Sequence, residues 1–257
     1  MTPCHPMRLL ALAVWFFPLV ALAAGYDTTV QWARRLELGL PVSGVIRSVD
    51  VDPGARVHRG QLLLALEDVP FRAVVEQAEA RVTERRADRD KAARDYKQAK
   101  ELYDRTVLSA VDLENARLKA NRTEAGLKAA GAQLSRARYE LDHSRITAPF
   151  DGWVLEVHAQ PGQSLVNALE AHPLIMLAAQ GEYEVHVRIP GPVVNGLKVG
   201  QNVNISVAGE GYAGRLRSIG FEPVAGKGGG KTLYEIGVVF TTQNLLRAGE
   251  PARVELP

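Results

Sequence analysis

The sequence has little of what catalysis and metal binding require. Its 257 residues include one cysteine, Cys4, so neither a disulfide framework nor a cysteine-based zinc site is available. The histidines do not pair at the spacing of metal ligands, and three methionines are too few for a soft-metal site. The six histidines are His5, His58, His143, His158, His172 and His186. Paired-carboxylate and G-x-S-x-G patterns are missing too, so we predict that the chain is not an enzyme and has no catalytic residue, metal or cofactor.

Charge and aromatic content narrow the function further. Lys plus Arg is 31 and Asp plus Glu is 29, so the net charge is +2 and no global excess indicates nucleic acid as a partner. Aromatic residues make up 6%, which is low for a ligand pocket or a surface that stacks bases. Hydrophobic residues make up 46%, which predicts a folded body.

One long hydrophobic run is present, and it lies at the N-terminus. Leu9 to Ala23 is 15 residues, which is too short to span a bilayer comfortably. Arg8 precedes the run, which ends in the small-x-small pattern Ala21-Leu22-Ala23. This arrangement predicts a cleaved secretory signal over residues 1–23 and therefore an exported protein. An uncleaved membrane anchor is the alternative.

An internal repeat organises the rest of the chain. At a constant offset of 108 residues, two segments share the frame P-x-x-G-x8-P-G-x-x-(V/L). Pro41, Gly44, Val49, Pro53, Gly54 and Val57 match Pro149, Gly152, Val157, Pro161, Gly162 and Leu165. Prolines and glycines at matched positions indicate matched turns, and the apolar residues between them indicate short strands. We predict that the halves 41–68 and 147–178 pack together as one small β-sandwich, because neither is long enough to bury a core alone.

The residues between the halves predict a helical hairpin over 69–146. No proline occurs from Phe71 to Ala148, and apolar residues recur at alternating spacings of three and four, as in a coiled coil. The predicted seam is Val75, Ala78, Val82, Ala92, Tyr96, Ala99 and Tyr103 in the first arm, and Leu113, Ala116, Ala120, Thr123, Leu127, Ala130, Leu134, Ala137 and Leu141 in the second. Asp68 is the expected N-cap of the first arm, and Ser109 or Asp112 caps the second.

Arg85 and Arg89 lie on the first seam and interrupt its apolar pattern. Their stems can pack along the partner helix with the charged heads in water, or the side chains can face a neighbouring protomer. Both interpretations remain open from the sequence.

The C-terminal third reads as a small β-barrel. Short strands are predicted at 183–189, 202–208, 212–219, 233–241 and 252–256, with a further strand within 28–38. The expected barrel domain is therefore 27–40 and 179–257. Residues 225–232, AGKGGGKT, nearly match a phosphate-binding loop, but strands flank them where that loop requires a helix, so we predict a flexible hairpin loop.

The two halves resemble biotinyl/lipoyl domains, and the order half-domain, helical hairpin, half-domain, barrel resembles the periplasmic adaptor (membrane fusion) proteins of bacterial tripartite efflux pumps and secretion systems. The resembling stretches are PVSGVIRSVDVDPGARVHRGQLLLALED at 41–68, FRAVVEQA at 71–78, TAPFDGWV at 147–154 and LLRAGEPARVEL at 245–256. The resemblance implies an elongated, mixed α and β fold. Its parts are a split biotinyl/lipoyl-like β-sandwich, an inserted antiparallel coiled-coil hairpin and a small β-barrel.

The resemblance also implies a function and a contact site. The family's hairpin tip contacts an outer-membrane channel, and its pattern falls here on Arg105, Leu108, Ser109, Glu114 and Ala116. The implied partners are that channel, an inner-membrane transporter of the resistance-nodulation-division or ABC type, and further copies of the chain in a homo-oligomer, a hexamer. The implied location is the periplasm, at the inner membrane. The sequence stops where the last barrel strand should end, so we expect no membrane-proximal domain after the barrel.

Two other functions stay open. A biotin- or lipoyl-carrying enzyme component would present a modified lysine on the turn joining the halves, but no lysine occurs from Pro41 to Arg89. An exported scaffold that binds another partner through its coiled coil is the third possibility. The sequence does not identify an exported substrate.

Overall fold

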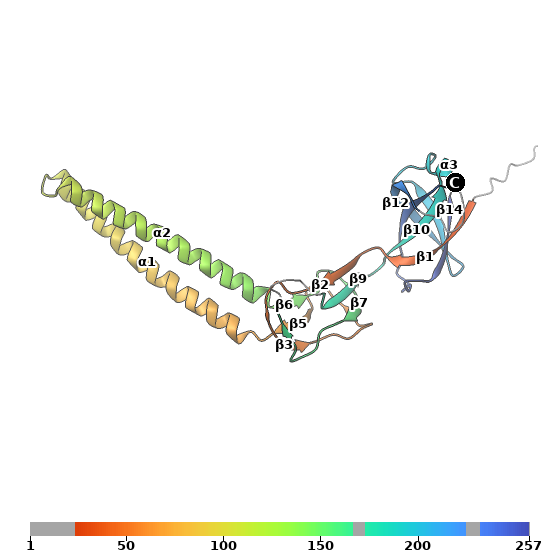
Figure 1. The fold of residues 1–257 in the computed structure, drawn as a ribbon, viewed down its shortest axis with the longest axis horizontal. Coiled ribbons are helices and arrows are strands. Elements are labelled where there is room, and N and C mark those ends of the chain that lie inside the picture. The colour runs from red at the N-terminus through yellow and green to blue at the C-terminus, as the bar shows by residue number, and fades with distance from the viewer. Residues whose placement is uncertain (1–23, 167–172, 225–231, 257) are drawn as a thin grey trace, which may run out of the picture. The chain divides into compact units, whose positions relative to one another are not determined.

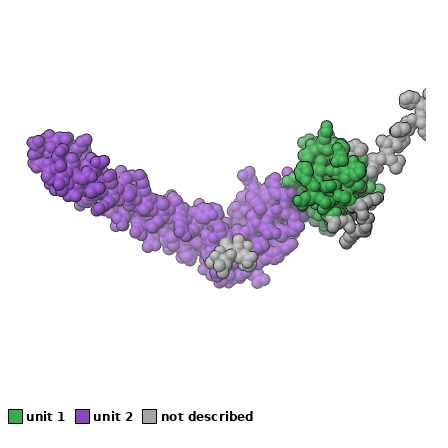
Figure 2. Space-filling model, turned by 45° about the horizontal axis from the view of Figure 1, so that its top comes forward, with its two compact units in different colours: residues 1–31, 184–241, 246–257 green, residues 32–183, 242–245 purple. Residues whose placement is uncertain are grey.

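The computed structural model describes residues 24–166, 173–224 and 232–256, which form two compact units (Figure 1). Figure 2 colours them separately: the hairpin unit comprises residues 32–183 and 242–245, and the barrel unit residues 1–31, 184–241 and 246–257. The predicted signal peptide and residues 225–231 of the glycine-rich segment lie outside the described residues. Within the described part, no helix combines the length and the apolar character needed to cross a membrane.

The core of the hairpin unit is a pair of four-stranded sheets with the orders β2-β9-β7-β4 and β6-β5-β3-β8. The strands of the first sheet are β2 (Arg35–Leu38), β4 (Arg56–Val57), β7 (Gly152–Val157) and β9 (Ile175–Ala179), and those of the second are β3 (Gly44–Val49), β5 (Leu62–Leu66), β6 (Arg145–Thr147) and β8 (Ser164–Leu165). Both sheets contribute to one buried core that includes Ile46, Leu64, Val154 and Leu177. We call this two-sheet body, formed by the strands within residues 35–66 and 145–179, the hybrid.

A pseudo-twofold exchange relates the two repeats. The Gly54 amide donates to the Val154 carbonyl at 2.8 Å, and at the same offset of 108 residues the Gly162 amide donates to the Ile46 carbonyl at 2.8 Å. In the same way β4 of the first repeat pairs with β7 of the second, while β8 of the second pairs with β3 of the first. Gly54 and Gly162 both have positive φ, 85° and 83°, as the matched turns require. Each half therefore completes the other half's sheet.

The pairing of two short strands, β2 and β6, corrects the predicted domain boundaries. Residues 27–40 were assigned to the barrel, but β2 pairs with β9 inside the hybrid, and only the residues before it join the barrel. Its pseudo-equivalent β6, which was assigned to the hairpin through residue 146, pairs with β5. Strands of three or four residues are too short to carry a periodic signal, and no glycine or proline separates β2 from the strand before it.

Two long helices are inserted between β5 and β6. α1 spans Val69–Asp104 and α2 spans Ala110–Asp142, and they lie side by side in opposite directions (Figure 1). The predicted seam positions are buried or half-buried, except Tyr103, which is 41% exposed. Half-buried Leu102 lies next to it, as the drift of a 3.6-residue helix against a heptad repeat would produce. Buried Ala92, Ala130 and Ala137 keep the contact between the helices close.

The seam arginines pack along the partner helix. The Arg85 stem approaches Gly126 of α2, and a Cβ added to that glycine would lie 3.8 Å from Arg85 Cδ. Arg89 Nε lies 3.2 Å from Asp90 and 3.9 Å from Glu124 of α2. The two arginine side chains remain 40% and 38% exposed. The stems therefore cover the seam and the side chains stay partly exposed, while Arg89 Nε is itself buried beside the two carboxylates.

Asp68 lies at the predicted N-cap of α1, but its side chain does not cap the helix. Its backbone angles, φ −88° and ψ −14°, are helical instead of extended, and no side-chain cap bond forms. Its carboxylate instead pairs with Arg72 at 2.7 Å and Arg47 at 3.1 Å. Burial alone would raise the pKa of Asp68, but hydrogen bonds from Arg72 and the backbone, with the charges of Arg72 and Arg47, together hold it below its usual range.

The barrel unit is a closed six-stranded barrel in the order β1-β10-β13-β12-β11-β14. The strands are β1 (Ala24–Trp32), β10 (Glu182–Pro190), β11 (Asn202–Val207), β12 (Glu210–Val224), β13 (Leu233–Thr241) and β14 (Pro251–Leu256), and the one-turn helix α3 (Gly191–Val194) follows β10. Inward-facing residues alternate with outward ones along β10 and β14. The predicted barrel is confirmed. The glycine-rich segment is flanked by paired strands, with Val224 opposite Leu233.

One glycine of a helix and one of a strand offer a test of the packing. A Cβ at Gly131 of α2 would meet nothing within 4 Å, so Gly131→Ala should stabilise the hairpin by about 1 kcal/mol through helix propensity alone. The matched variant Gly152→Ala should destabilise the hybrid, because its Cβ would overlap the Ala178 carbonyl oxygen. Urea unfolding followed by circular dichroism at 222 nm measures both. Equal effects of the two substitutions would contradict the packing described for Gly152.

Asp68 gives the junction between hybrid and hairpin a defined pH response. Because its pKa is lowered in the folded chain, its stabilising contribution is present above the pKa of an unfolded aspartate and is lost as pH falls through the folded value. Asp68→Asn should therefore lower the urea midpoint at pH 7 and leave it unchanged at pH 2. A lowered midpoint of the same size at both pH values would show that the charge of Asp68 is not responsible.

Candidate functional site: the hairpin tip

The hairpin tip consists of the loop 105–109 and the helix turns beside it. The Thr106 amide donates to the Tyr103 carbonyl at 2.8 Å, and the Val107 amide donates to the Leu102 carbonyl at 3.0 Å. Thr106 has a φ of 59°, in the left-handed region that a β-branched residue rarely adopts. A strained backbone that is pinned by hydrogen bonds at a loop apex is a feature that often accompanies function.

Ser109 begins the second helix. Its φ and ψ of −73° and 155° are extended, and its hydroxyl accepts from the Asp112 amide at 3.1 Å. The same hydroxyl donates to the Asp112 carboxylate at 2.7 Å. Asp112 also places a negative charge in the first turn of α2, where the helix dipole favours it. The predicted cap role of Ser109 is confirmed.

The other predicted tip residues differ in where they lie. Arg105 is the exposed C-cap of α1, and Leu108 is half-buried. Glu114 is exposed and forms an ion pair with Arg117 at 3.7 Å. Ala116 is half-buried on the seam that packs against α1, so it contributes to the joint between the helices. The structure thus brings Arg105, Leu108 and Ser109 into one loop, with Glu114 and Ala116 in the turns below it.

Two tip residues were missed by the sequence reasoning. Val107 is 72% exposed and Val111 is 69% exposed, one on each side of Ser109. The available signal was that both valines fall outside the heptad seam, in a segment where a solvated turn would carry polar residues.

The charge at the tip differs from that of the rest of the hairpin. Residues 101–117 carry four acidic and two basic side chains, whereas residues 71–145 as a whole carry 13 acidic and 17 basic ones. The acidic residues near the tip are Glu101, Asp104, Asp112 and Glu114, and the basic ones are Arg105 and Arg117. The tip therefore carries a net negative charge, whereas the rest of the hairpin carries a net positive charge.

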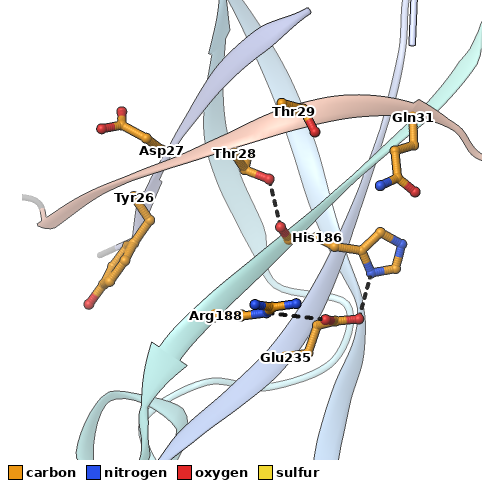
Figure 3. A pocket seen from close by; sticks show the side chains of 8 residues that line it. All are labelled: Tyr26, Asp27, Thr28, Thr29, Gln31, His186, Arg188 and Glu235. Atoms are coloured by element: carbon orange, nitrogen blue, oxygen red, sulfur yellow. Dashed lines mark hydrogen bonds and ion pairs between the residues drawn. The ribbon is translucent and has the colours of Figure 1, made fainter. Parts of the chain in front are cut away.

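The barrel unit carries a second candidate site, a polar hollow of about 470 Å³ lined by residues of β1, β10 and β13. Figure 3 shows the Glu235 carboxylate between the His186 ring and the Arg188 guanidinium, at 3.3 Å and 3.8 Å. Thr28 of β1 donates to the His186 carbonyl at 2.6 Å. Asp27, which also lines the hollow, pairs with Arg253 of β14 at 2.8 Å. These polar contacts link neighbouring strands of the barrel. In the described ranges no cluster of three histidine or acidic side chains could hold a metal ion.

A known family matches the hybrid and its hairpin. The family described as CzcB-like, barrel-sandwich hybrid domain covers residues 36–172. The chain belongs to this family. The match begins at the second residue of β2, which agrees with the corrected boundary of the hybrid. The resemblance to membrane fusion proteins is thereby confirmed.

Curated relatives extend the comparison. The chain is 27% identical over 203 residues to the macrolide export protein MacA of Escherichia coli O157:H7, a match that covers 72% of this chain and 55% of MacA. It is 27% identical over 162 residues to the multidrug resistance protein MdtA of Erwinia amylovora, covering 63% of this chain and 40% of MdtA. The chain thus spans about half the length of the curated relatives it matches.

Solved structures share the fold. The membrane fusion protein Spr0693 of Streptococcus pneumoniae R6 superposes with a TM-score of 0.70 at 18% identity, covering 91% of this chain and 98% of that one. A MacA–MexA chimera that contains the Pseudomonas aeruginosa MexA α-hairpin domain superposes with a TM-score of 0.64 at 19% identity, covering 90% and 80%. These structures confirm the mixed α and β fold class of the CzcB-like chain.

The cap at Ser109 can be tested directly in the CzcB-like hairpin. Ser109→Ala should destabilise the first turn of α2 by about 1 kcal/mol, whereas Ser109→Thr should largely keep it, because threonine is also an N-cap residue and its hydroxyl can still donate to the Asp112 carboxylate. Hydrogen exchange at the Asp112 and Leu113 amides measures the effect. Unchanged protection in Ser109→Ala would contradict the capping role.

Proposed function

We propose that this chain is a periplasmic adaptor that links an inner-membrane transporter to an outer-membrane channel and catalyses nothing. The observation that carries the proposal is a helical hairpin inserted into a barrel-sandwich hybrid, with a tip that is constrained and exposed. The names of the relatives support it, because they describe macrolide export, multidrug resistance and, for a Brucella suis relative, an efflux pump periplasmic linker. The predicted signal peptide supports the periplasmic location.

The hybrid connects the hairpin to the barrel unit along the chain. The pseudo-twofold exchange makes β5 and β6 equivalent to β9 and β2. The first pair leads into the hairpin, and the second pair connects along the chain to strands of the barrel unit. Two equivalent strand pairs of the hybrid thus lead into two different parts of the chain, the hairpin and the barrel unit.

The proposed contacts follow from this division. The tip, with Arg105, Leu108, Ser109, Glu114 and Ala116, docks on the outer-membrane channel, and the barrel unit faces the transporter, of the resistance-nodulation-division or ABC type. The chain acts as a homo-oligomer, a hexamer. The exported cargo passes through the assembly without chemical change, so no cofactor is required.

The carrier alternative lacks the residue it needs. A biotin or lipoyl carrier presents a lysine on the turn between its halves, and in this fold the two pseudo-equivalent positions follow β5 and β9. These positions hold Glu67-Asp68, which leads into α1, and Gln180-Gly181, which leads into β10. Neither contains lysine.

Reversing one tip charge tests the adaptor function. Glu114→Lys should abolish efflux in a deletion strain complemented with the variant, because it reverses the charge of an exposed tip residue, while the fold persists because its ion pair with Arg117 is solvated. Accumulation of a panel of macrolides, dyes and metal ions measures the loss. The matched control Glu140→Lys, on the same helix and ion-paired with Arg136, should retain efflux.

Cross-linking provides the second readout. Because the only cysteine, Cys4, lies in the predicted signal, Asn115→Cys gives the mature chain a single thiol near the tip. A cross-link from this position to the outer-membrane channel is expected in wild-type background and not with Glu114→Lys. Normal efflux and normal cross-linking in Glu114→Lys would defeat the assignment of the tip. If the deletion strain accumulates no compound of the panel above the level of the wild-type strain, the proposed adaptor function is wrong.

A further inference from the structure

The resemblance implies that Ser109 and Ala116 contact a partner, but in the structure both residues make interactions within the tip itself. The Ser109 hydroxyl uses its one proton for the Asp112 carboxylate and accepts from the Asp112 amide. Ala116 is half-buried on the seam against α1. These two residues therefore position the tip, and we expect the contact with a partner on the exposed surface beside them.

That surface is apolar and held in place. Val107 and Val111 are 72% and 69% exposed, and Ser109 between them fixes the start of the helix that carries Val111. Val107 follows the left-handed Thr106, and its amide is bonded to the Leu102 carbonyl. Exposure alone does not distinguish the tip, because Val69 and Val74 at the other end of α1 are 74% and 48% exposed. At the tip the exposure coincides with a strained backbone that is tied down on both sides, which is the preorganisation a docking site needs.

The charges identify the kind of partner. Four acidic and two basic side chains surround the valines in residues 101–117, on a hairpin that is otherwise basic. Anionic lipid surfaces attract basic segments, so an acidic tip does not favour a membrane. A protein surface with an apolar notch and a basic rim matches both the valines and the acidic rim.

We propose that Val107 and Val111 are the docking residues of the tip, and that they insert into an apolar, basic-rimmed notch at the periplasmic end of an outer-membrane channel. This inference rests on the proposed function, because that function supplies the channel. Ser109 and Ala116 are positioning residues, and the acidic rim sets the orientation of docking.

The probe is the purified outer-membrane efflux channel of the source organism in nanodiscs, with binding of the full mature chain measured by biolayer interferometry. The double variant Val107→Ser/Val111→Ser should weaken binding by about 30-fold or more, because buried anchors dominate the affinity of small interfaces. The matched control Val69→Ser/Val74→Ser, which replaces exposed valines at the base, should bind within about 3-fold of wild type, within the scatter of neutral contacts.

Further variants separate contact from folding. Val107→Ile/Val111→Ile keeps the surface apolar and should retain binding. Ser109→Thr keeps a hydroxyl at the cap and should retain binding as well. Circular dichroism and hydrogen exchange at the Asp112 amide show that each tip variant is folded. Raising NaCl from about 50 to 300 mM should weaken wild-type binding several-fold if a basic rim faces the acidic tip.

The outcomes distinguish the two proposals. A wild-type chain that does not bind the channel overturns the proposed partner and the inference that depends on it. Wild-type binding that Val107→Ser/Val111→Ser leaves intact overturns the docking role of the valines while the adaptor function stands. Loss of binding to phosphatidylglycerol vesicles, with channel binding unchanged in the double variant, would assign the valines to a membrane and equally overturn the inference.

Discussion

The rest of the structure depends on the exchange of strand partners between the two halves of the hybrid. Gly54 of the first repeat bonds to Val154 of the second, and Gly162 of the second bonds to Ile46 of the first. Because each half supplies strands to the other half's sheet, the core is shared and neither half has an independent fold. The mature chain lacks cysteine if its signal is cleaved, so this ladder and its core hold the hybrid without covalent help.

The same paired strands also anchor the base of the hairpin. The base of the hairpin continues directly from β5 and returns through β6, and both strands pair inside the hybrid. The ion pairs of Asp68 with Arg47 and Arg72 lie at the junction between β5 and α1 and stabilise it. The orientation of the hairpin on its base is thus set by backbone hydrogen bonds, and the length of the helices sets how far the tip lies from them.

At the tip, the residues that build the loop and the residues that remain available are different sets. Ser109 and Asp112 satisfy each other, and Ala116 packs between the helices. Val107 and Val111, by contrast, are 72% and 69% exposed. A residue of the tip motif can therefore be essential because it shapes the surface of the tip, while neighbouring residues make the contact with the partner protein. In the polar hollow of the barrel, too, the Glu235 carboxylate is engaged by its neighbours His186 and Arg188.

The sequence by itself determined the periodic parts of this protein. Proline and glycine at a constant offset located the matched turns of the hybrid, a heptad pattern located the helix seam, and alternation located the barrel strands, because each depends on local geometry. Tertiary structure decided the rest. The short strands β2 and β6 belong to the hybrid only because partners distant in sequence pair with them. The left-handed backbone at Thr106, which no glycine in the sequence indicates, is held by the hydrogen bonds of the Thr106 and Val107 amides to the last turn of α1. The exposure of Val107 and Val111 is likewise seen only in the structure, because it depends on how the chain reverses between the two helices.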